Sequence, residues 1–265
     1  MIPVSLTATR VWLGRALLIA GTPLLLGDLV GNLPAQELSA DRPTFTPSPL
    51  VIPKGSLQLE AGYTLADASN IVVHSLGEVL LRIGLTKEIE FRVGWLGYVW
   101  LDQFGSTISS GANDGSVGIK WSIKTAGERP GIDIGILAGT SVPIGDANIG
   151  TGDWQPGATL VIGWGLTEWL SLTTSMGYAY QFVARRFDQG FISASFSAAT
   201  SPRFSLFLEG YGFNKEQAGG SGSLLTNGGF VLALGKRWLL DARVGIGLGD
   251  SATDVFAGVG FVTAW

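Results

Sequence analysis

The chain has 265 residues, a formal net charge of −4 and 14% charged residues, whereas an average soluble domain has roughly 25%. The absence of a basic stripe argues against a nucleic-acid partner, and the absence of cysteine excludes a disulfide framework and a thiolate metal site. The mean hydropathy of +0.34 is high for a soluble protein, yet beyond the N-terminus no run of about 18 apolar residues predicts a spanning helix.

Residues 1–35 have the pattern of a cleaved signal peptide. Arg10 and Arg15 supply positive charge, residues 16–26 form a short apolar core, and Ala35 ends the segment before Gln36. A membrane anchor is the alternative, but Pro23 interrupts the apolar core. We therefore expect export through the inner membrane, with the mature chain beginning near residue 36.

Residues 36–54 form a separate, proline-rich segment. Prolines at positions 43, 47, 49 and 53 exclude a central β-strand here, because proline cannot donate to a sheet ladder. Two placements remain open for this segment. It is either an extended periplasmic tail or a plug inside whatever residues 55–265 build.

Residues 55–265 alternate between apolar residues and small or charged residues, which predicts β-strands with two distinct faces. About twelve strands of roughly 10 residues fit this pattern. We place them near 55–65, 72–85, 88–100, 115–124, 131–143, 156–165, 168–180, 190–199, 203–213, 227–235, 238–248 and 254–265.

The connections alternate in length. Tight turns are expected at 86–87, 125–130, 166–168, 200–203 and 235–237, and longer polar loops at 101–114, 144–155, 181–189 and 214–226. Short periplasmic turns and longer external loops are typical of outer-membrane barrels. The fold class predicted is therefore an all-β, antiparallel transmembrane β-barrel in the outer membrane.

The charged residues in the strands decide which face meets lipid. A basic residue on the lipid face costs about 2–4 kcal/mol near the midplane, so the charged set must point inward and the aliphatic set outward. The candidate lumen-lining residues are Glu60, Glu78, Arg82, Glu90, Arg92, Lys120, Asp133, Glu209, Asp241 and Arg243. Inward glycines such as Gly62, Gly84 and Gly135 leave space, which predicts a narrow water-filled lumen unless residues 36–54 fold into it.

No catalytic residue, cofactor or metal site is expected, and we do not predict an enzyme. Outer-membrane phospholipases use a Ser–His pair, and His74, the one histidine of the chain, is followed by Ser75. Neighbouring residues in a strand point to opposite faces, which argues against this pair.

Residues 40–63 resemble the opening of the family named "Putative MetA-pathway of phenol degradation". The resemblance is carried by Asp41, Arg42, Pro43, Ser48, Pro49, Pro53, Gly55, Gln58, Glu60 and Gly62, while Ala40 and Ile52 stand where threonine and valine are usual. Residues 80–95 and 116–123 are similar to the next strands of that family. The resemblance implies an outer-membrane barrel that moves small molecules, aromatic ones among them.

Together these observations predict a channel for passive passage of small, aromatic or hydrophobic solutes. Membrane lipid, small-molecule solutes and the barrel-assembly machinery, reached through the last strand ending in Trp265, are the expected partners. A non-conducting structural or surface-interaction barrel is the alternative, and a membrane phospholipase is a weaker one.

Overall fold

The computed structural model describes residues 38–68, 70–249 and 253–265. Within these ranges no helix is long and apolar enough to span a membrane. The described strands are β1 (Leu57–Ala68), β2 (Ile71–Gly84), β3 (Ile89–Trp95), β4 (Tyr98–Gln103), β5 (Ser106–Ala112), β6 (Gly115–Lys124), β7 (Gly131–Val142), β8 (Pro156–Gly165), β9 (Leu170–Val183), β10 (Arg185–Ser201), β11 (Phe204–Phe213), β12 (Ser223–Ala233), β13 (Trp238–Gly247) and β14 (Val255–Ala264).

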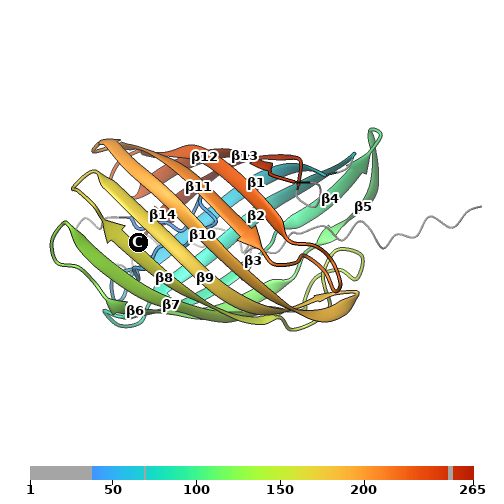
Figure 1. Ribbon diagram of the computed structural model, residues 1–265, viewed down its shortest axis with the longest axis horizontal. Helices are drawn as coiled ribbons and strands as arrows, with labels where there is room; N and C mark the ends of the chain where they lie inside the picture. Colours follow the sequence, from blue (N-terminus) through green and yellow to red (C-terminus); the bar gives the residue numbers. More distant parts are fainter. Residues whose placement is uncertain (1–37, 69, 250–252) are drawn as a thin grey trace, which may run out of the picture.

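These strands form one closed antiparallel barrel (Figure 1). β1 pairs with β2 on one side and with β14 on the other, so the first and last strands close the wall. The long strand β2 pairs with β3 in its second half and with β4 in its first half, and β6 and β5 continue that arrangement. β3 and β4 therefore share one position around the barrel, and β6 and β5 share the next. The fourteen strands thus fill twelve positions.

The predicted barrel and its strand number are confirmed, and most predicted bounds lie close to the observed ones. Two predicted loops are wrong. Residues 101–114 are largely the β4–β5 hairpin, which projects at the right of Figure 1, and residues 181–189 mostly belong to β9 and β10. Serine and threonine dominate residues 106–110, and residues 185–189 include two arginines and an aspartate. These strand ends continue beyond the apolar band of the wall, so the alternation of hydrophobicity fades.

A break in the wall separates β3 from β4. Gly97 has a φ of +86°, a left-handed conformation that favours glycine, and Gly77 on the neighbouring strand has a φ of +80°. The strand bends at this point. The sequence predicts a single strand over 88–100, since the alternation resumes directly after the break.

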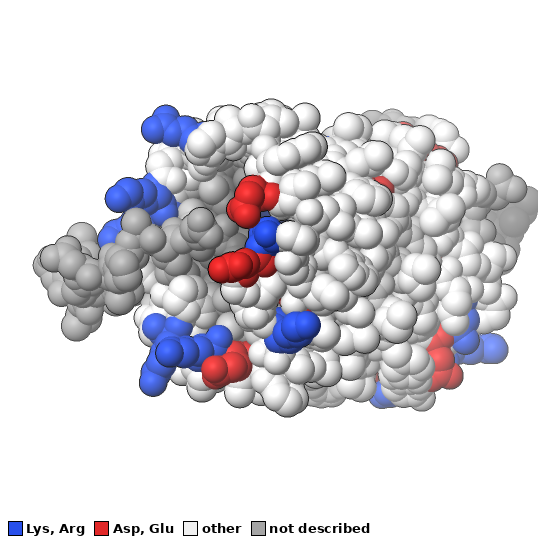
Figure 2. Space-filling view, turned by 60° about the vertical axis from the view of Figure 1, so that its left-hand side comes forward, with Lys and Arg blue, Asp and Glu red and all other residues white. Residues whose placement is uncertain are grey.

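The outer surface of the wall is apolar. Ile192, Leu208 and Met176 are between 60 and 69% exposed, whereas Arg82, Glu90 and Lys120 are completely buried. In the space-filling view, a broad uncoloured band covers the middle of the wall, and charged residues gather toward its two ends (Figure 2). A surface of this kind suits hydrocarbon, and the buried charges require partners inside the barrel.

The segment preceding β1 supplies those partners. Its peptide groups and side chains contact inward residues of strands on opposite sides of the barrel, from Glu90 on β3 to Glu209 on β11. Ile52 is fully buried and Phe45 is 8% exposed. Residues 41–53 therefore lie inside the barrel and cross its interior, as the blue trace in Figure 1 shows.

Candidate functional site

The barrel interior has two parts, which we name by the ends of the barrel. The turn end carries the tight turns such as 86–87, together with Leu57 and Trp265. The loop end carries the β4–β5 hairpin and residues 143–155. The N-terminal segment, residues 41–53, fills the turn-end half, and a cavity occupies the space between this segment and the loop end.

An ion-pair cluster holds the segment on the side of β2, β3 and β6. Arg82 Nη2 lies 2.8 Å from Glu90 Oε2, and Arg92 Nη1 lies 2.6 Å from Asp41 Oδ2. Lys120 Nζ donates to both carboxylate oxygens of Asp41 at 3.0 Å. One carboxylate from the segment therefore neutralises cations from two strands of the wall, β3 and β6.

The glutamates of this cluster also bind the segment's backbone. Glu90 Oε2 accepts a hydrogen bond from the backbone N–H of Ile52 at 2.9 Å. Glu60 accepts from the N–H groups of Asp41 and Arg42 at 3.0–3.2 Å. These contacts compensate peptide groups that the prolines of the segment prevent from joining a sheet.

A second cluster lies on the side of β1, β2 and β13. Arg42 binds Glu78 at 3.1 Å and Asp241 at 3.4 Å. Arg243 donates to the backbone oxygen of Pro43 at 2.9 Å and to the hydroxyl of Thr64 at 3.1 Å. The wall here supplies two carboxylates and one guanidinium to the segment.

Glu209 on β11 forms the third attachment. Its carboxylate accepts hydrogen bonds from the backbone N–H groups of Phe45 and Thr46 at 2.7 and 2.6 Å. The Thr46 hydroxyl and the Asn227 amide also donate to it, at 2.6 and 2.8 Å. Within the part of the chain that the structure describes, this buried carboxylate is thus satisfied by neutral donors, without an ion pair.

Nine of the ten predicted lumen-lining residues contact the N-terminal segment directly, and the structure brings them together through it. Asp133 is the exception. It binds the backbone N–H of Ala126 at 2.7 Å and Arg129 at 2.9 Å, and so stabilises the turn between β6 and β7. The side chains of these ten residues lie on the inner face of the barrel wall, and most of them meet protein there.

The inward glycines have the same partner, which corrects the interpretation that they leave a free path. A Cβ at Gly135 would lie 2.5 Å from the backbone oxygen of Pro49, and one at Gly62 would collide with the guanidinium of Arg42. At Gly84 it would collide with the backbone of Pro53. These glycines make room for the segment.

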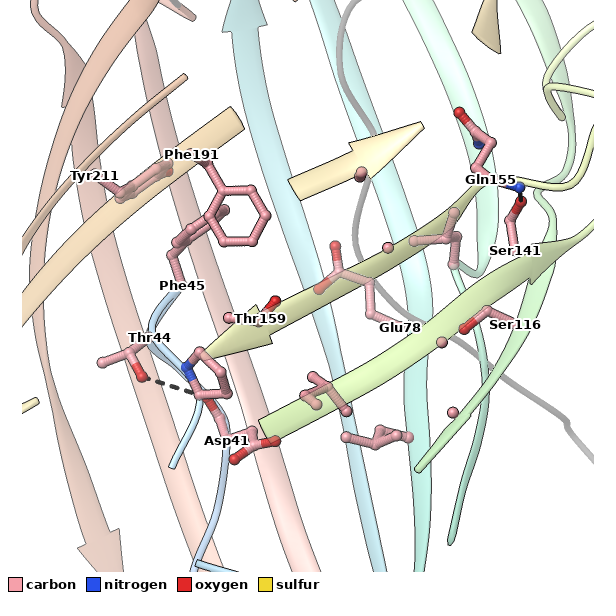
Figure 3. Close-up of a pocket in the computed structure, with 18 of the residues that line it drawn as sticks. Asp41, Thr44, Phe45, Glu78, Ser116, Ser141, Gln155, Thr159, Phe191 and Tyr211 are labelled. Atoms are coloured by element: carbon pink, nitrogen blue, oxygen red, sulfur yellow. Dashed lines mark hydrogen bonds between the residues drawn. The ribbon is translucent and has the colours of Figure 1, made fainter. Parts of the chain in front are cut away.

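The cavity above the segment has a volume of about 470 Å³. Four predicted residues line it: Glu60, Glu78, Arg92 and Arg243. Its polar side includes hydroxyl and amide groups from the wall, and Figure 3 shows Ser116, Ser141 and Gln155 on this side, across from Phe45. The opposite side is aromatic, and sequence reasoning missed it.

The aromatic wall consists of Phe45 from the segment with Phe191, Tyr211, Phe213 and Phe256 from the barrel. Phe45 stacks on Tyr211, with ring centroids 4.3 Å apart and planes 1° from parallel. Figure 3 shows Phe45 directed toward Phe191 and Tyr211. A signal for Tyr211 and Phe213 was present, because both share the strand face of Glu209.

His74 and Ser75 do not form a nucleophile–base pair. Ser75 is buried and donates to the backbone oxygen of Leu96 at 2.8 Å, on the inner face. On the outer face, His74 Nδ1 is 2.7 Å from the Tyr63 hydroxyl, and its ring stacks on Trp100 at 4.7 Å. The phospholipase alternative loses its one candidate pair.

Comparisons with known proteins agree with this architecture. A family model described as "Putative MetA-pathway of phenol degradation" matches residues 40–265. An outer membrane channel from Pseudomonas putida F1 superimposes with a TM-score of 0.64 at 12% identity, covering 82% of this chain and 97% of that one. The NanC porin (TM-score 0.53, 10% identity) and the KdgM porin (0.52, 13%) each cover 78% of this chain and 98% of theirs. No curated protein matches the chain in sequence.

Proposed function

We propose that this chain, which belongs to the family described as "Putative MetA-pathway of phenol degradation", forms a passive outer-membrane channel for small solutes. The observation that carries the proposal is a cavity of about 470 Å³ with charged and aromatic walls, enclosed by a barrel whose outer surface is apolar. Solutes enter the cavity from the loop end. They pass the turn-end half when the N-terminal segment, residues 41–53, moves aside.

The attachment of the segment is compatible with movement. Polar contacts hold it at three places: the Asp41 cluster, the pairs of Arg42, and Glu209. When the segment moves, water in the lumen can hydrate the charged groups that it leaves, so these groups are not left unpaired in a dry interior, which would be the costly case. No energy source is required, because a solute moves down its concentration gradient.

The exposed tryptophan rings and the seam between β1 and β14 suggest the membrane partners. Exposed rings such as Trp121, Trp169 and Trp238 would lie at the lipid–water interface near the turn end. Trp265 pairs with Leu57 across the barrel seam, with N–O distances of 2.9 and 3.1 Å. The proposed contact of the last strand with the assembly machinery therefore precedes closure of the seam.

The proposed signal peptide, residues 1–35, lies outside the described residues.

The experiment that tests the channel is a conductance measurement in planar bilayers. The wild-type protein is compared with a variant that lacks residues 38–53. We expect discrete, brief openings for the wild type and larger, long-lived steps for the deletion variant. Correct insertion is verified by the heat-modifiable migration of a folded barrel in gel electrophoresis.

The second candidate is a non-conducting structural barrel. The observation that favours it is the complete burial of Arg82, Glu90 and Lys120 against the N-terminal segment. A sealed bilayer with both inserted proteins would support this candidate and refute the channel. Conductance by the deletion variant alone would show that the segment keeps the wild-type barrel closed.

A further inference from the structure

The aromatic wall already holds one phenyl ring. Phe45 stacks on Tyr211 and meets Phe191 and Phe213 edge-on, with centroid distances of 5.6 and 5.3 Å. Offset-stacked and edge-on arrangements are the favourable geometries for aromatic pairs. This ring comes from the N-terminal segment, whereas its three partners belong to β10 and β11. The wall of the barrel therefore presents a surface that fits a second planar ring beside Phe45 or in its place.

The charges around the cavity do not all cancel locally. The carboxylates of Asp41, Glu60 and Glu78 each lie within ion-pair distance of an arginine or lysine. Glu216 in the β11–β12 loop accepts a hydrogen bond from the Ser223 hydroxyl. The carboxylates of Asp41, Glu60 and Glu78 are thus already compensated by cations.

Arg243 differs from the other cations of the interior. Among the described residues no carboxylate lies within ion-pair distance of its guanidinium. Asp241, on the same strand, forms its ion pair with Arg42 and attracts Arg243 only from a longer distance. Each Nη nitrogen carries two hydrogens but donates one hydrogen bond, in both cases to a neutral oxygen. Nε has no hydrogen-bond partner among the described residues. The guanidinium lies 5.7 Å from the ring centre of Phe256, next to the aromatic wall.

We propose that the cavity binds a small aromatic carboxylate, with its ring on the wall formed by Tyr211, Phe191 and Phe213 and its carboxylate on Arg243. A planar carboxylate matches the fork of N–H donors of a guanidinium. The cavity volume of about 470 Å³ accommodates a single-ring acid. This assignment rests on the proposed function, because it names the class of solute that the channel would pass.

Binding is tested on the folded protein in detergent by isothermal titration calorimetry, with three probes that each have one six-membered ring. Benzoate carries the ring and the charge, benzyl alcohol lacks the charge, and cyclohexanecarboxylate lacks the aromatic ring. We expect the wild type to bind benzoate about tenfold more tightly than either analogue, since benzyl alcohol loses the hydrogen bonds of a charged group and cyclohexanecarboxylate loses the aromatic pairing.

Two variants separate the two halves of the site. Arg243→Gln should bind benzoate and benzyl alcohol equally, and Tyr211→Leu should bind benzoate and cyclohexanecarboxylate equally. Arg186→Gln, which changes an exposed arginine outside the cavity, is the matched control and should keep the wild-type preference. Equal binding of all three probes by the wild type, or an unchanged preference in Arg243→Gln, would overturn the proposal.

The outcome is independent of conductance. If benzoate binds selectively and the bilayer stays sealed for both proteins, the binding site stands and the channel is refuted. If the protein conducts and benzoate shows no preference over its analogues, the channel stands and the aromatic carboxylate is refuted. Should Arg243→Gln fail to fold, the preference of the wild type among the three probes still decides the assignment.

Discussion

Lys120 on β6 binds Asp41 of the N-terminal segment across 79 residues of chain, and its Nζ lies 3.0 Å from each carboxylate oxygen. Arg92 reaches the same carboxylate at 2.6 Å. The negative charge of Asp41 therefore links the segment to two strands of the barrel wall. This relationship makes Asp41 the most direct place to loosen the segment.

We expect Asp41→Asn to destabilise the folded barrel by about 3 kcal/mol, because it leaves buried cations with one carboxylate fewer. The free energy of unfolding is measured by urea titration in lipid vesicles with tryptophan fluorescence. The open probability in planar bilayers should rise in parallel. Asp153→Asn, which removes the partner of the half-exposed Arg186, is the control and should change neither quantity measurably. Equal effects of the two variants would argue against the Asp41 attachment.

A reversible lock can be built between Thr46 and Ser193, whose hydroxyl oxygens are 2.8 Å apart. The chain has no cysteine, so Thr46→Cys with Ser193→Cys introduces the sole thiol pair. The closeness of the two side chains is compatible with a disulfide. We expect oxidation to abolish openings in planar bilayers and a reductant to restore them. Openings that persist in the oxidised protein would show that solutes do not need the segment to move.

Gly135 on β7 tests the fit of the segment from the side of the wall. Its added Cβ would lie 2.5 Å from the backbone oxygen of Pro49, so Gly135→Val should displace the segment and lengthen channel openings. Gly210→Val is the matched control, because the nearest atom to its Cβ is 3.9 Å away. Openings are compared as dwell times in single-channel records. Identical records for the two variants would contradict the contact at Pro49.

Arg82 and Arg92 are register partners on β2 and β3, yet their environments differ. Arg92 lines the cavity, whereas Arg82 is fully buried against Glu60 and Glu90. We expect Arg92→Gln to shift the reversal potential in a salt gradient toward cation selectivity.

Arg82→Gln should leave the reversal potential unchanged and lower the free energy of unfolding by about 3 kcal/mol or more, because two buried carboxylates lose a partner. The opposite assignment, with selectivity changed at Arg82, would move the conducting path to the other side of the segment. The two single variants therefore serve as controls for each other.

The sidedness of the barrel follows from residues read in isolation. Arg82 and Lys120 alternate with aliphatic neighbours, and the cost of exposing their charge to lipid leaves a single solution. The same rule extends to the strand face that carries Glu209, and it would have identified Tyr211 and Phe213 as interior residues. Local alternation is sufficient information because each strand spans the bilayer, so its own residues show both the lipid face and the inner face.

The position of the N-terminal segment does not follow from such local rules. The prolines exclude a central strand over residues 41–53, but they are as compatible with a tail outside the barrel as with a segment inside it. The barrel-wall residues that bind Asp41 and Phe45 lie from 19 to more than 160 residues away in sequence. Glycines such as Gly135 suggested empty space for the same reason, since the atoms that fill it belong to a distant part of the chain.

The N-terminal segment that fills the barrel, residues 41–53, is covalently attached to the first strand of the wall. Residue 53 is four positions from Leu57, where the first strand begins, so a displaced segment stays close to its binding position inside the barrel. A short tether corresponds to an effective concentration in the millimolar range, and reclosure becomes a unimolecular event. Each opening would then end by itself, at a rate that is independent of how many copies of the protein the cell makes.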